Sequence, residues 1–460
     1  MTQDDLAQLS REELIQMILV LSEQLAQLKA DNEALRLKLE KGKKPPTNSS
    51  NSSQPPSRDH KGSLPADRRK RKHGPPVGHA RHERQFVANP DQEVELKAET
   101  CRGCAADLRK VEGVLRKVNQ ITELPPAKAE VIEVRQHEVI CPECGMTQVG
   151  EPVVGLEMDR AFGARLEATV VYYRQEQHMS YQRTQAALRC LHGVTLSQGG
   201  IDKIMQRAGN KAIQAVEPIQ ERVRQSAVIH SDETGSRVDA SNWWEWVFCT
   251  MTDSLHVMRF NRSVDVIRDV MGQHQAEVWV SDCLAAQLKA PAQQRQLCLA
   301  HQLRNLQAVV DLEPSAFWPQ AMQALFRYAI HLHDQRQQLP VDQYTQQVQR
   351  IEHLCDWLLK RSLHQEQAAR LQRRYLKHRQ SLFVFLYRSD VEPTNNRSER
   401  ALRPSVIHRK VSGGFRSGWG ANAYAALASV IDTAELNNVH AFDAIQSLLG
   451  IPSLPLPSGP

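Results

Sequence analysis

The sequence between residues 226 and 282 alternates between strand-like and helix-like patterns in an order that few folds share. Three runs rich in β-branched and aromatic residues come first, separated by turn residues at Gly235 and at Asp253-Ser254. A run with helical spacing follows at 263–274, and a fourth strand-like run follows at 276–282. We therefore expect a mixed α/β domain that begins with three strands, a helix and a fourth strand.

This element order is the beginning of the RNase H-like (retroviral-integrase-like) fold. In that fold the first and fourth strands bring two acidic residues side by side, and Asp232 and Asp282 have these positions here. Clustered carboxylates repel one another, so such a site requires divalent cations. Two alternatives stay open, because strand alternation does not decide between Asp232 and Glu233, and because Asp282 can instead cap the following helix.

A third carboxylate is expected on a later helix. Glu399 lies in the segment NNRSERALRP, where Asn395 can cap a helix and Pro404 would kink or end it about one turn after the glutamate. The alternative is a solvated helix face on which Glu399 pairs with Arg403. Residues 313–390, which precede this segment, are helical in pattern, and we interpret them as an all-helical insertion into the catalytic core.

Two CxxC pairs indicate a metal site in the N-terminal half. Cys101 and Cys104 form one pair, Cys141 and Cys144 form the other, and strand-like residues separate them. The chain starts without the pattern of a secretory signal, so thiols in a reducing cytoplasm favour metal binding over disulfides. Four thiolates close a tetrahedral Zn²⁺ site, which predicts a structural zinc ribbon over residues 85–155. A chance pair of CxxC motifs is the alternative.

Residues 1–40 predict a coiled-coil helix. Leucines recur at sevenfold spacing, with Asn32 at a core position where a polar residue usually fixes the register of a parallel dimer. We therefore expect a homodimer or a higher oligomer, and the alternative is an amphipathic helix packed on the same chain. The sevenfold positions are Leu14, Leu21, Leu28 and Leu35.

A basic linker follows at residues 41–84. It contains twelve Lys and Arg against three Asp and Glu, together with many Pro, Ser and Asn, so it cannot bury enough apolar surface to fold alone. Its basic run either binds DNA phosphates or belongs to a solubilising linker. The run consists of Arg68, Arg69, Lys70, Arg71 and Lys72.

Residues 156–224 predict two helices separated by a break at His192-Gly193. The pair is either a helix-turn-helix-like DNA-binding segment or an ordinary pair of core helices. The catalytic core then covers 225–312 and 391–432, and a C-terminal helix and tail cover 433–460. No apolar stretch approaches the ~20 residues that span a bilayer, so we expect no membrane segment.

The order of five motifs along the chain resembles that of transposases of the insertion sequence 66 family, whose catalytic domain is of the DDE type. A leucine-rich first helix, the NSSQPPS linker and the double CxxC module recur in that family in the same order. The resemblance therefore covers nearly the whole chain. The motifs are HSDETGSRV, VWVSD, CLAH, NNRSERALRP and SGGFRSGWGANAYAALASVIDTAELN.

The resemblance implies that Asp232, Asp282 and Glu399 are the DDE triad and hold two Mg²⁺ or Mn²⁺ ions. It further implies cleavage at the terminal inverted repeats of an insertion sequence and transfer of the freed 3′-hydroxyl to target DNA. Companion proteins of the same element are possible partners. The expected location is the bacterial cytoplasm, in association with the nucleoid.

Other residues near the triad receive supporting roles. Cys298 and His301 lie three apart in a helical stretch and offer two metal ligands whose partners the sequence does not reveal. Arg400 and Arg403 flank Glu399 and are expected to contact DNA, although a solvated helix face predicts the same residues.

Two other functions remain as alternatives. One is a zinc-dependent DNA-binding regulator with an inactive RNase H-like domain, and the other is an RNase H-like nuclease without strand transfer. Metal-dependent nicking of DNA separates the enzymes from the regulator, and a strand-transfer product separates the transposase from the nuclease.

Overall fold

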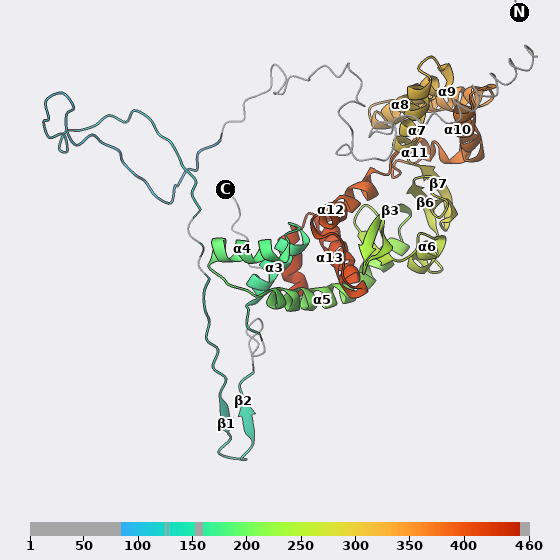
Figure 1. The fold of residues 1–460 in the computed structure, drawn as a ribbon. Coiled ribbons are helices and arrows are strands. Elements are labelled where there is room, and N and C mark those ends of the chain that lie inside the picture. The colour runs from blue at the N-terminus through green and yellow to red at the C-terminus, as the bar shows by residue number, and fades with distance from the viewer. Residues whose placement is uncertain (1–83, 125–126, 128, 152–159, 451–460) are drawn as a thin grey trace, which may run out of the picture. The chain divides into compact units, whose positions relative to one another are not determined.

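The computed structural model describes residues 84–124, 127, 129–151 and 160–450 (Figure 1). The predicted coiled-coil helix, the linker with its Arg68–Lys72 run and the tail after residue 450 lie outside the described residues. Two compact units divide the described chain. Unit 1 contains residues 224–232 and 263–399, and unit 2 contains residues 84–223, 233–262 and 400–450.

The strands form a five-stranded mixed sheet with the order β5-β4-β3-β6-β7. The β4 and β5 strands are antiparallel, whereas β3, β6 and β7 run parallel. The predicted order of three strands, a helix and a fourth strand is confirmed, with α6 (Val264–Met271) as the helix before β6. The strands are β3 (Val228–Val238), β4 (Ser241–Cys249), β5 (Ser254–Arg259), β6 (Ala276–Ser281) and β7 (Ala292–Leu297).

The turn predicted at Gly235 is wrong. The β3 strand continues through this glycine, and the chain reverses at Asp239 and Ala240, whose φ angles of 45° and 57° suit a tight hairpin turn. A glycine inside a strand often marks a close approach, and a Cβ at Gly235 would lie 3.9 Å from the ring of Trp244. The fifth strand, β7, was not predicted, because its sequence AQQRQL is mostly polar.

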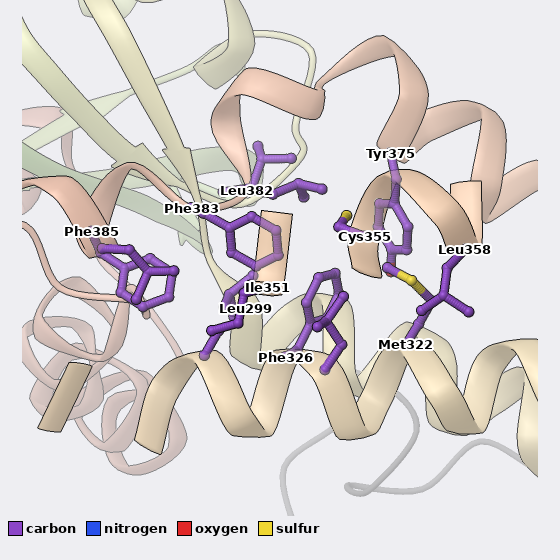
Figure 2. Close-up of a cluster of buried hydrophobic side chains, with 14 of the residues drawn as sticks. Leu299, Met322, Phe326, Ile351, Cys355, Leu358, Tyr375, Leu382, Phe383 and Phe385 are labelled. Carbon is purple, nitrogen blue, oxygen red and sulfur yellow. The ribbon is translucent and has the colours of Figure 1, made fainter. Parts of the chain in front are cut away.

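Unit 1 contains the helices predicted for residues 313–390. They surround an aromatic core in which Phe326 contacts Tyr375 edge to face, with ring centroids 5.5 Å apart, and also contacts Phe383 (Figure 2). In Figure 1 they gather beside β6 and β7. The unit 1 helices from α7 onward are α7 (Leu299–Leu312), α8 (Phe317–Asp334), α9 (Val341–Leu359), α10 (Glu366–Lys377) and α11 (Val384–Tyr387).

Unit 2 contains the predicted helix pair. The α4 helix (Tyr181–His192) ends at Gly193, whose φ of 66° is left-handed, and Ser197 accepts a hydrogen bond from Gly200 at the start of α5 (Gln198–Arg224). Leu196 is buried in the turn. The pair packs with α3 (Ala164–Gln175), α13 (Gly418–Leu436) and α14 (Ala441–Leu449). No helix in the described part of the chain is long and apolar enough to cross a membrane.

The two strands of the N-terminal part of unit 2 form a short antiparallel hairpin. They are β1 (Glu138–Ile140) and β2 (Thr147–Val149), and the second CxxC pair lies in the loop between them.

The SGGF motif attaches a loop to the end of β3. Phe415 donates its backbone N–H to Arg237 at 2.8 Å and accepts from Asp239 at 2.9 Å, so it extends the sheet edge. This close approach requires Gly414, since its φ is 123° and a Cβ there would lie 2.5 Å from the Arg237 carbonyl oxygen.

Gly414→Ala should therefore lower the free energy of unfolding by roughly 2 kcal/mol or more. Gly413→Ala is the matched control, because Gly413 also has a positive φ but has no atom within 4 Å of the added Cβ. It should cost only about 1 kcal/mol. Chemical denaturation of both variants measures the difference, and equal losses would contradict the close-approach explanation.

Candidate active site

The register of two parallel strands brings the first two predicted carboxylates to the same level. Residue Val228 of β3 pairs with Val278 of β6, and His230 pairs with Val280, which is a constant offset of 50 positions. Continued two residues beyond its last pair, this offset would bring Asp232 level with Asp282, which directly follows β6. Adjacent strands lie about 4.8 Å apart, so this register would place the two half-buried aspartates near each other.

The neighbouring Glu233 has a different role. It is buried and accepts a hydrogen bond from Arg262 Nε at 3.0 Å, and the Arg262 guanidinium also stacks over the Trp244 ring at 4.5 Å. Glu233 is therefore neutralised within unit 2. This arrangement favours Asp232 over Glu233 as the strand carboxylate of the site.

Asp282 caps the turn that follows it, whereas the predicted alternative was a cap of the next helix, whose N-cap is Ala286. Its Oδ1 accepts the backbone N–H of Leu284 at 2.7 Å. The second carboxylate oxygen does not take part in that bond. Among the described residues no Lys or Arg forms an ion pair with Asp282, so capping and metal binding by this carboxylate are compatible.

The start of helix α12 (Asn396–Ser412) is tied to β3 by one buried side chain. Asn395 is fully buried, and its Nδ2 donates to the backbone carbonyl of Ser231 at 2.8 Å, directly before Asp232. Its Oδ1 accepts from Ser398 at 2.9 Å, and its backbone N–H points to the Cys298 sulfur at 3.1 Å. Asn395 thus connects β3, α7 and the helix of Glu399.

Glu399 lies in the first turn of α12 and meets two side chains of α7. Arg304 donates to Glu399 Oε1 at 3.1 Å, and His301 Nδ1 lies 3.5 Å from the same oxygen. Glu399, His301 and Cys298 form a group whose ligand atoms all lie within 4.8 Å of one another. The structure therefore brings the supporting pair predicted from the sequence directly to the third carboxylate.

The surroundings lower the basicity of His301 and hold Cys298 as a thiol. Burial lowers the pKa of His301, Arg304 lowers it further, and Glu399 and Asp282 act in the opposite direction. Burial raises the pKa of Cys298 to about 11 despite its hydrogen bonds with backbone N–H groups. In this state the Cys298 sulfur accepts a hydrogen bond from the Asn395 backbone.

Asn395→Ala should destabilise unit 1 by about 1 to 3 kcal/mol, because it leaves the Ser231 carbonyl without its buried donor. Asn395→Asp retains the shape but places an acceptor where a donor is needed, so it should cost at least as much. Thermal unfolding measures both. A loss below about 0.5 kcal/mol for both variants would show that the bridge does not fix the start of α12.

Other predicted features of α12 have mixed outcomes. Arg400 and Arg403 are exposed, as DNA-contacting residues would be, but a solvated face explains their exposure equally.

The helix does not end near Pro404, since it continues to Ser412. A proline inside a helix removes one hydrogen bond, and the packing of Leu402 and Ser405, both buried, offsets that loss. Glu399 forms its ion pair with Arg304 and not with Arg403, the pairing that the alternative interpretation expected.

Both CxxC pairs form tight turns. Ala105 donates to the Cys101 carbonyl and Gly145 donates to the Cys141 carbonyl, each at 2.9 Å. Hydrogen bonds from the backbone of Cys104 and Gly103 lower the pKa of Cys101, and the corresponding residues of the second turn lower that of Cys141. Among the described residues the four sulfurs do not gather within 4.8 Å of one another. The zinc ribbon stays a prediction.

A mixed sheet of this order, interrupted by a helical insertion, is the framework of a DDE transposase core. The model of the family described as Transposase IS66 family matches residues 160–423, more than half of the chain. The chain belongs to this family. The matched span includes the three predicted carboxylates and the α7 residues that surround Glu399. No curated protein sequence matches the chain.

Proposed function

We propose that the chain cuts DNA at the ends of an insertion sequence and joins those ends to target DNA, with Asp232, Asp282 and Glu399 as its catalytic carboxylates. The observation that carries this proposal is the β3–β6 register, which supports a shared site for the two aspartates. The third member comes from α12, whose start is tied to β3 by Asn395.

The donor set fits a hard divalent cation such as Mg²⁺ or Mn²⁺. Two half-buried aspartates at one level offer carboxylate oxygens, and like charges so close need a cation to neutralise them. A bound cation would activate water and stabilise the charge on a phosphodiester under attack. Asp232, Asp282 and Glu399 are the residues that would hold it.

The protein's own side chains would orient the third carboxylate. Arg304 donates to one oxygen of Glu399, and His301 lies beside the same oxygen. These two contacts from α7 would hold the carboxylate in place and leave its second oxygen for a cation. Cleavage frees a 3′-hydroxyl at the element end. That hydroxyl then attacks a target phosphodiester in the same site, so no covalent enzyme intermediate is required.

The N-terminal half would recognise the DNA ends. The basic run Arg68–Lys72 and the α4–α5 pair would contact DNA, the four CxxC cysteines would hold structural Zn²⁺, and the coiled-coil helix would pair two chains. Each of these assignments rests on the sequence pattern. Arg400 and Arg403 would add positive charge near the scissile phosphate.

The test is cleavage and joining of a labelled duplex that carries the terminal inverted repeat, with Mg²⁺ or Mn²⁺ added. The proposal expects a nicked end and a larger strand-transfer product. Nicking without a joined product would identify a nuclease. Binding without nicking, in the presence of the element's companion proteins, would identify a DNA-binding regulator.

A further inference from the structure

Helix α10 of the insertion carries a row of cations on the side opposite its buried residues. Spacings of three and four place these cations on one helix face. Three of them are exposed and the fourth is half-buried. The opposite face contributes Ala368, Leu371 and Tyr375 to the unit 1 core, and Figure 2 shows Tyr375 there. The row, called the α10 stripe below, consists of Arg370, Arg373, Arg374 and Lys377.

Acidic residues are few in the sequence around the α10 stripe. The segment 360–379 contains seven Lys and Arg and one acidic residue, Glu366. Within the part of the chain that the structure describes, none of the four stripe side chains forms an ion pair or a hydrogen bond. By contrast, Arg379, directly after the helix, is held by Glu352 and Asp356.

Helix stability does not account for the stripe. Like charges at i and i+4, such as Arg370 with Arg374 and Arg373 with Lys377, destabilise a helix by a few tenths of a kcal/mol per pair. Cations in the last turn interact favourably with the helix dipole, which explains Arg374 and Lys377. Arg370 and Arg373 precede that turn, so the helix dipole does not explain them.

The helix of the α10 stripe packs against α7, which carries Arg304 beside Glu399. Cys283 packs against the unit 1 core to which α10 contributes. Cys283 directly follows Asp282, and Gln302 of α7 donates to its sulfur at 3.3 Å. Helix α10 therefore lies beside the helix whose side chains contact both Glu399 and the residue that follows Asp282.

We propose that the α10 stripe binds the phosphate backbone of the DNA duplex whose end occupies the active site. The four residues span about 10 Å along the helix axis, which matches about three successive phosphates of one strand. Such contacts position a duplex without reading its sequence. This inference rests on the proposed function, because it assumes that DNA enters the site at Asp282.

The test compares two double variants of the full chain. Arg370→Gln with Arg373→Gln removes two stripe cations. Arg327→Gln with Arg350→Gln removes two exposed cations from α8 and α9 and is the charge-matched control. Anisotropy measures the affinity for a labelled 30-base-pair duplex of arbitrary sequence across salt concentrations, without added Mg²⁺ so that no cleavage occurs.

The stripe variant should reduce the slope of log affinity against log salt by about 1.8 and weaken binding about tenfold or more at low salt. The control should retain the wild-type slope, and Arg370→Lys with Arg373→Lys should restore it. The stripe variant should also not lower the melting temperature, which excludes misfolding. An unchanged slope, or an equal loss in the control, would overturn the proposal. In the separate cleavage assay with Mg²⁺, failure of the wild type to cut the terminal-repeat duplex would count against the proposed function alone.

Discussion

Asp282→Asn should reduce DNA cleavage by at least about a hundredfold while DNA affinity stays within about twofold. The substitution removes a negative charge beside Asp232, so the site loses a ligand for its cation. An asparagine oxygen can still accept the Leu284 N–H, and the turn after β6 is therefore preserved. The expected loss is one of catalysis and not of folding.

The control is Asp265→Asn, because Asp265 is an exposed carboxylate of α6 that pairs with Arg268 outside the site. Cleavage of a labelled duplex and anisotropy of the same duplex measure catalysis and binding separately. Retention of more than a tenth of the wild-type cleavage by Asp282→Asn would remove Asp282 from the triad. A loss of binding in parallel would indicate a structural effect.

His256→Ala should destabilise unit 2 by about 3 to 5 kcal/mol, the largest stability effect expected in the chain. The fully buried imidazole of His256 lies between two carboxylates, with Nδ1 2.9 Å from Glu245 and Nε2 2.9 Å from Asp432. Burial alone would lower the pKa of His256, but the hydrogen bonds to Asp432 and Glu245 outweigh it and raise the pKa to about 10. Removal of the imidazolium leaves two carboxylates without their shared cation.

The same network predicts how stability depends on pH. The pKa of His256 is higher in the folded state than the ordinary value of about 6.5 that applies when the chain is unfolded. Its contribution is therefore complete below pH about 6.5 and is lost as the pH rises toward about 10. Urea unfolding at pH 6 and pH 9 should show a larger decrease for the wild type than for His256→Gln. Equal decreases would contradict a charged His256.

The two carboxylates should differ in their importance. Glu245 is buried on β4 and also accepts from Ser405 at 2.7 Å, whereas the Asp432 side chain is 20% exposed. Glu245→Gln should therefore cost more stability than Asp432→Asn, because water can compensate only the second. Urea unfolding at pH 7 measures both variants, and the reverse order would contradict this description of the network.

The part of the fold that contains Asp232 and Asp282 could be predicted from the sequence because its strands have a regular pattern. The runs ending at Asp232 and Asp282 are apolar and β-branched, and their separation of 50 positions equals the offset of the β3–β6 register. The β7 strand is mostly polar and has no such pattern. Its strand structure depends on pairing with β6 in the sheet and not on its own sequence. The misplaced turn at Gly235 has a similar cause, because a glycine inside a strand resembles a turn residue.

The candidate site was predictable only in part. The residue type alone shows that a carboxylate can bind a metal ion, so Asp232, Asp282 and Glu399 could be proposed from the sequence. The bridge of Asn395 to Ser231 and the contact of Arg304 with Glu399 join positions 164 and 95 residues apart. No spacing rule predicts such contacts. The one signal for Arg304 was its place soon after the CLAH motif.

Iron-directed cleavage of the protein tests most directly whether three carboxylates from distant segments form one metal site. Fe²⁺ bound in place of Mg²⁺, with ascorbate and peroxide, cuts the backbone near its ligands. We expect cuts around Asp232, Asp282 and Glu399 together, all suppressed by excess Mg²⁺ and by Asp282→Asn. Cuts at only one of these segments, or cuts that Asp282→Asn leaves unchanged, would contradict a shared site.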